Sequence, residues 1–154
     1  MLKRLFAGLS LFVIPVLAQG CGWPDGPTAG NTPREMFEGL IQSPVPEDVR
    51  EIEGVGDLWQ SYNIWLRFKA SDAFIESLLA QGYVRVAWEQ VAGHMRLPDQ
   101  SGYHRFRPSW NPEAIEGKEC FAGHIRCRWS GQHSGEHFLV IDRRTGTVYF
   151  FGAG

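Results

Sequence analysis

Cysteine and histidine recur along one stretch of the chain, and they are the residues best suited to chemistry. The stretch holds Cys120, His124, Cys127, His133 and His137. Thiolate and imidazole are common ligands of zinc and copper, so a metal-binding or hydrolytic protein that uses this cluster is one hypothesis. The intervals match neither C-x-x-C nor H-E-x-x-H, which makes this hypothesis the alternative and not the favoured interpretation. In a metal site, the three histidines would be the ligands.

The two cysteines of this stretch, Cys120 and Cys127, form an even pair, which in an oxidising compartment often makes a disulfide. Along a continuous strand their Cα atoms would lie about 23 Å apart. A disulfide requires a separation of about 7 Å or less. We therefore expect a Cys120–Cys127 disulfide in which the chain folds back near Ala122 and Gly123.

No catalytic residue is predicted. A reactive cysteine usually lies at a helix N-terminus or beside a cation, whereas Cys120 lies in a strand-like run with no helix following it. Ser134 stands beside His133 but lacks the G-x-S-x-G arrangement of a nucleophilic serine. An acidic run is typical of a solvated face more often than of paired catalytic carboxylates, and it comprises Glu47, Asp48, Glu51, Glu53 and Asp57.

The elements that position these residues are organised around residues 62–88. Apolar and polar residues alternate from Tyr62 to Lys69, which predicts a strand with Ile64, Leu66 and Phe68 on one face. Ser71 or Asp72 can then cap a helix whose apolar stripe is Phe74, Ile75, Leu78 and Leu79, and Gly82 can end it. Alternation returns from Tyr83 to Trp88. The pattern predicts strand, helix and strand, with the helix packed on the Leu66 face.

Further elements follow from similar signals. Thr32-Pro33-Arg34-Glu35 matches a capping box, so a short helix is expected from Pro33. Residues 49–56 are expected to form a strand in a hairpin with the next one, and residues 118–129, 137–142 and 147–151 three more strands. Residues 89–95 can form a helical turn, and residues 97–117 are loop-like. The predicted fold is a single α+β domain over residues 32–154. It has an antiparallel-rich sheet of five or six strands with one main helix on one face.

Six tryptophans suggest a surface for a partner. Trp65 and Arg67 lie on the sheet face opposite the predicted helix, where they could form a partner-binding platform, since tryptophan and arginine often dominate interface energies. The alternative is that the long loop covers Trp65. The platform predicts that truncating Trp65 spares folding.

Residues 1–20 have the features of a secretory leader. Lys3 and Arg4 precede an apolar run that is too short to span a membrane, and the run ends in L-A-Q-G-C. Cleavage before Cys21 is expected, and this motif resembles the lipobox of bacterial lipoproteins, which implies lipidation of Cys21. The alternative is simple secretion with a stray thiol. Residues 21–31 are rich in Gly and Pro and are expected to form a flexible tether.

Two longer runs also resemble small bacterial lipoproteins of no known activity. They are G-D-L-W-Q-S-Y-N-I-W-L-R-F-K-A-S and I-D-R-R-T-G-T-V-Y-F-F. The net charge of the whole chain is −2, and without the leader there are 13 basic and 17 acidic residues, so a nucleic-acid partner is not expected. The sequence favours a non-enzymatic envelope protein, anchored in the membrane through an N-terminal lipid. It would face the periplasm or the cell exterior and bind an envelope protein or a cell-wall component, with no cofactor.

Overall fold

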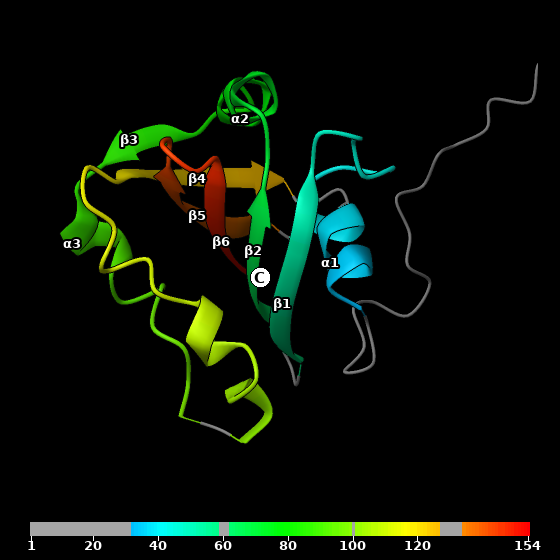
Figure 1. Cartoon of the computed structure of the whole chain (residues 1–154), viewed down its shortest axis with the longest axis vertical. Coiled ribbons are helices and arrows are strands. Elements are labelled where there is room, and N and C mark those ends of the chain that lie inside the picture. The colour runs from blue at the N-terminus through cyan, green and yellow to red at the C-terminus, as the bar shows by residue number, and fades with distance from the viewer. Residues whose placement is uncertain (1–31, 59–61, 100, 127–133) are drawn as a thin grey trace, which may run out of the picture.

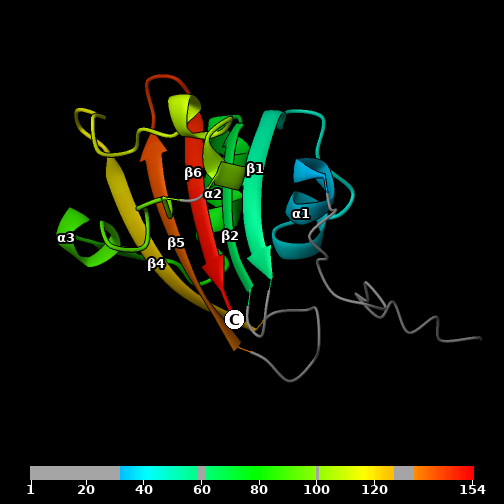
Figure 2. The same cartoon turned by 90° about the horizontal axis from the view of Figure 1, so that it is seen from below.

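A six-stranded antiparallel sheet forms the centre of the protein (Figure 1). The computed structural model describes residues 32–58, 62–99, 101–126 and 134–154. The strands are β1 (Arg50–Leu58), β2 (Tyr62–Lys69), β3 (Val84–Val86), β4 (Glu119–Arg126), β5 (Ser134–Asp142) and β6 (Thr147–Ala153). Their order in the sheet is β1-β2-β6-β5-β4-β3, and Figure 2 shows β4, β5, β6, β2 and β1 side by side. The α+β prediction is confirmed.

In the part of the chain that the structure describes, three helices accompany the sheet: α1 (Pro33–Leu40), α2 (Asp72–Leu79) and α3 (Trp88–Val91). Two short 3-10 turns, η1 (Ser101–Tyr103) and η2 (Arg107–Ser109), lie in the long segment between α3 and β4. The caps predicted from the sequence are present. Thr32 and Glu35 form the capping box of α1, and the Ser71 hydroxyl accepts a hydrogen bond from the Phe74 amide at 3.1 Å. None of the described helices is long and apolar enough to cross a membrane.

Strand β6 joins two halves of the sheet. It pairs with β2 on one side and with β5 on the other, so that Phe150 lies opposite both Leu66 and Leu139. The β1–β2 and β4–β5 hairpins are thereby brought into one sheet. Helix α2 makes the connection from β2, which lies in one half, to the edge strand β3 in the other.

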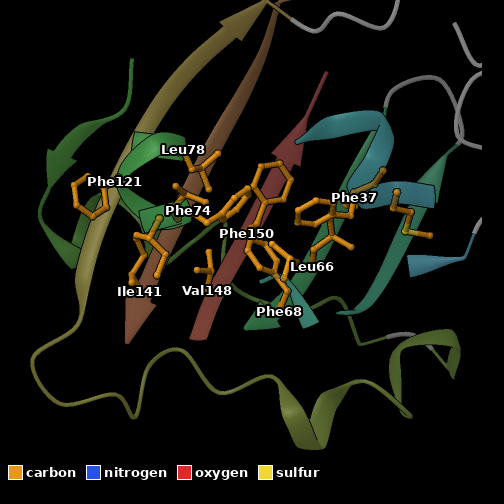
Figure 3. Close-up of a cluster of buried hydrophobic side chains, with 14 residues drawn as sticks. Phe37, Leu66, Phe68, Phe74, Leu78, Phe121, Ile141, Val148 and Phe150 are labelled. Carbon is orange, nitrogen blue, oxygen red and sulfur yellow. The ribbon is translucent and has the colours of Figure 1, made fainter. Parts of the chain in front are cut away.

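The first core lies between one face of the sheet and helices α1 and α2. Figure 3 shows side chains from α2, β5, β6 and β2 directed toward one another. Phe37 of α1 meets Phe68 edge-on, with ring centroids 5.0 Å apart. The fully buried members from the sheet are Ile64, Leu66, Phe68, Leu139, Ile141, Val148 and Phe150. The predicted packing of α2 on the Leu66 face is confirmed, and α1 shares that face.

The second core covers the opposite face of the sheet. Its cover is α3 and the long segment that follows, drawn in green to yellow in Figure 1. Burying each large apolar side chain adds about 1.5–3 kcal/mol to the free energy of unfolding, so the packing of this segment stabilises the fold. The buried residues of the second core are Trp65, Val91, Met95, Leu97, Tyr103, Phe106, Trp110, Cys120, Val140, Tyr149 and Phe151.

The strand expected from Tyr83 to Trp88 is shorter in the structure. Only Val84–Val86 pair with β4, because Trp88 already begins α3. Val84 is 66% exposed, and no other large hydrophobic residue in the described part of the chain is classed as exposed. Gly82 has a φ of 110°, as expected for a residue just after a helix end.

Leu66→Ala should lower the free energy of unfolding by about 2–5 kcal/mol, because it removes buried methyl groups and leaves a cavity under α1 and α2. Urea denaturation of the purified domain measures this loss. Val84→Ala is the control, since an exposed edge residue should change stability by no more than about 0.5 kcal/mol. Equal effects of the two substitutions would contradict the first core.

Candidate functional site

Trp65 lies beneath the long segment and is not an exposed platform. Its side chain is 5% exposed, and its indole Nε1 donates a hydrogen bond to the His94 carbonyl at 2.9 Å. Its ring centroid lies 5.6 Å from that of Tyr103 and 4.9 Å from that of Phe151. The expectation of a partner-binding platform at Trp65 is wrong, because this face forms a second core. The alternative, in which the loop covers Trp65, is confirmed.

Arg67, the other proposed platform residue, is also largely covered. Its side chain is 19% exposed, and its Nη1 lies 3.5 Å from a carboxylate oxygen of Glu53 across the β1–β2 hairpin. Lys69 makes the neighbouring pair with Glu51 at 2.9 Å, and this hydrogen bond lowers the pKa of Glu51 below its usual value. These members of the acidic run are therefore ion-pair partners of β2, and the pairs leave Arg67 little free surface.

Side chains attach the long segment to the sheet and to itself. Trp110 Nε1 donates a hydrogen bond to the Met95 carbonyl at 2.7 Å, and Arg107 Nη2 donates one to the Pro98 carbonyl at 2.8 Å. The His94 ring stacks on Phe138, with centroids 3.9 Å apart. These bonds satisfy backbone carbonyls that no helix or strand would otherwise pair. The segment is thus a fixed part of the domain.

Residues 92–110 of this segment expose three arginines, which sequence reasoning missed. Arg96, Arg105 and Arg107 are exposed, and we call them the arginine surface. His104 is exposed beside them. Arg107 lies 3.6 Å from Asp99, while Arg96 and Arg105 have no ion pair with any described residue. The sequence does contain a pattern that indicates these exposed arginines, because each of them is next to an apolar residue. These apolar neighbours are buried in the structure: Met95, Leu97 and Phe106.

Cys120 does not take part in the predicted disulfide. Its thiol is free and buried in the second core, and burial raises its pKa. Strand β4 continues from Glu119 to Arg126, paired with β5 at every position, so the fold-back near Ala122 and Gly123 does not occur. The prediction is wrong because the chain does not turn at Gly123, where the absence of a side chain instead makes room for the Tyr83 ring. A Cβ there would lie 2.8 Å from the Tyr83 ring, which crosses the strand at this point.

His137 is buried on the helix side of the sheet and is 1% exposed. Its Nδ1 shares a hydrogen bond with the Tyr83 hydroxyl at 3.4 Å, and its Nε2 has no partner among the described residues. Burial lowers the pKa of His137 to about 4, assisted by the charge of His124. Burial also raises the pKa of Tyr83. Both groups are therefore uncharged at neutral pH.

The histidines of the metal hypothesis do not come together in the described structure. His124 is exposed, and alternation along β4 puts it on the face opposite His137, since its neighbour Gly123 faces Tyr83. In the part of the chain that the structure describes, no group of three or more His, Cys, Asp or Glu side chains could hold a metal ion. His133, Cys127 and Cys21 lie outside the described residues.

Comparison of the chain with known protein families, with characterised proteins and with solved structures finds no match.

Trp65→Ala should lower the free energy of unfolding by about 3–5 kcal/mol, because it empties the centre of the second core. Trp65→Phe is the matched control. It keeps an aromatic ring but leaves the His94 carbonyl without its donor, so the loss should be smaller, about 1–3 kcal/mol. Urea denaturation measures both variants. A wild-type midpoint in Trp65→Ala would mean that the long segment does not cover this face.

His137 should make stability depend on pH. Because its pKa is lowered from 6.5 to about 4, the unfolded chain binds a proton between these values that the folded chain does not. The free energy of unfolding should therefore fall as pH decreases through this window, by on the order of 2 kcal/mol from pH 7.5 to pH 5. His137→Gln should remove this component from the pH profile of urea denaturation. The exposed His104→Gln variant should keep it, and an unchanged slope in His137→Gln would contradict the assignment.

Proposed function

We propose that this protein is an exported, lipid-anchored envelope protein whose domain binds a protein or cell-wall partner and does not catalyse a reaction. The observation that carries the proposal is the leader with its cysteine. A positive n-region and a short apolar run end in L-A-Q-G-C, and Cys21 directly follows the expected cleavage site. The resemblance of two further runs to small lipoproteins supports the same location in the cell envelope.

The position of the domain relative to Cys21 suits such an anchor. Ten residues separate Cys21 from Thr32, where the described structure begins with the capping box of α1. Ten residues span at most about 36 Å when fully extended. A domain attached in this way stays within about its own diameter of the membrane, where its partners would also be concentrated.

The environments of Cys120 and His137 argue against a catalytic role for these two side chains. A nucleophilic cysteine needs a lowered pKa, and burial raises the pKa of Cys120. A general base should titrate near the working pH, and His137 is kept neutral and shielded from solvent. Both side chains pack in apolar surroundings, which is the setting of structural residues.

Cys21→Ser should abolish acylation and release the protein from membranes, because it removes the sulfur to which the diacylglyceryl group would be attached. Metabolic labelling with a palmitate analogue and fractionation of cells that express the protein measure the two effects. Cys120→Ala is the control, since its thiol is buried and should leave labelling and membrane association unchanged. Wild-type protein that is unlabelled and soluble after fractionation would refute the anchor.

A further inference from the structure

The first part of the long segment between α3 and β4, residues 92–110, differs in charge from the rest of the chain, whereas its second part, residues 111–118, holds Glu113, Glu116 and Lys118. Residues 92–110 contain three arginines and one acidic residue, Asp99. Without the leader the chain has 13 basic and 17 acidic residues, and leaving out residues 92–110 gives 10 basic and 16 acidic residues. A basic surface on an otherwise acidic domain attracts an anionic partner to one place and disfavours its approach elsewhere.

The arginines are presented from a rigid base. Arg96 lies between the buried Met95 and Leu97, and Arg105 and Arg107 lie on either side of the buried Phe106. The hydrogen bond from Arg107 to the Pro98 carbonyl joins the part of the segment that carries Arg107 to a residue two positions from Arg96. Fixing the backbone in advance reduces the entropy lost on binding.

We propose that the arginine surface is the docking site for an acidic segment of a partner protein. This inference rests on the proposed function and identifies the surface and the chemistry of that partner. Guanidinium groups bind carboxylates through two parallel hydrogen bonds, and Arg96 and Arg105 have no ion-pair partner within the described residues. Arg107 shares its charge with the exposed Asp99, which a partner's carboxylate can displace.

A discrete protein surface fits these features better than a lipid surface does. Peripheral membrane binding combines basic residues with apolar side chains that enter the headgroup region. The aromatic residues of the segment, Tyr103, Phe106 and Trp110, are instead turned inward and buried in the second core. The net negative charge of the remaining domain also opposes adsorption to an anionic leaflet.

The test uses the chain from residue 21 with Cys21→Ser, which keeps it soluble, and a fluorescent peptide of ten glutamates as the probe. We expect saturable binding that weakens as salt rises from 50 to 300 mM. The double variant Arg96→Ala/Arg105→Ala should weaken binding at least tenfold. The matched control is Arg50→Ala/Arg144→Ala, which removes two exposed arginines elsewhere and should bind as the wild type does. Equal loss in both double variants would show only a dependence on net charge and would overturn the proposal.

Two further measurements complete the test. Vesicles of phosphatidylglycerol should bind the protein no better than vesicles of phosphatidylcholine; binding to phosphatidylglycerol without binding to the peptide would overturn the proposal in favour of a lipid. In intact cells, cross-linking of the lipidated protein should give an adduct that the Arg96→Ala/Arg105→Ala variant loses and the control keeps. An adduct that persists in that variant refutes the arginine surface as the docking site but leaves the proposed partner-binding function intact. The absence of any adduct with the wild type refutes the proposed function itself.

Discussion

Strand β6 is buried on both faces, and the rest of the fold follows from this. Every residue from Thr147 to Gly152 is buried, with Val148 and Phe150 in one core and Tyr149 and Phe151 in the other. A strand of this kind needs an apolar cover on each side of the sheet. Helices α1 and α2 supply one cover through regular secondary structure. The other is supplied by a segment with little regular structure, which must therefore obtain its stability from side chains.

That irregular cover explains the use of the tryptophans. A segment without a helix or strand has backbone carbonyls that need donors, and an unpaired buried carbonyl costs about 1–3 kcal/mol. The indoles of Trp65 and Trp110 donate to the carbonyls of His94 and Met95, while their rings fill the core. Tryptophan can do both because it combines a large apolar surface with one donor. Among the described residues, Trp65 and Trp110 thus serve packing under the long segment.

The elements could be predicted from sequence wherever their signals are local. Alternation marked β2, the Ser71 hydroxyl marked the start of α2, and Gly82 its end. The same alternation correctly placed Trp65 on the sheet face opposite α2, but alternation within one strand does not indicate which segment covers that face. The long segment has no period, so no sequence rule assigns it to one side of the sheet. The contact of His137 with Tyr83 joins residues 54 positions apart, and Gly123, which allows it, has the appearance of a turn residue when its partner is unknown.

The central place of β6 also governs the order of assembly. It is the last of the six strands to be synthesised, yet it separates β2 from β5 in the sheet. Until residues 147–153 are available, the β1–β2 and β4–β5 hairpins have no strand to join them, and the two-sided core cannot close. Pairing β2 with β6 spans most of the domain in sequence, which is typical of slow folding. An emerging chain therefore stays open until β6 has been synthesised, which suits the export proposed above, because a chain crosses a membrane channel in an extended state.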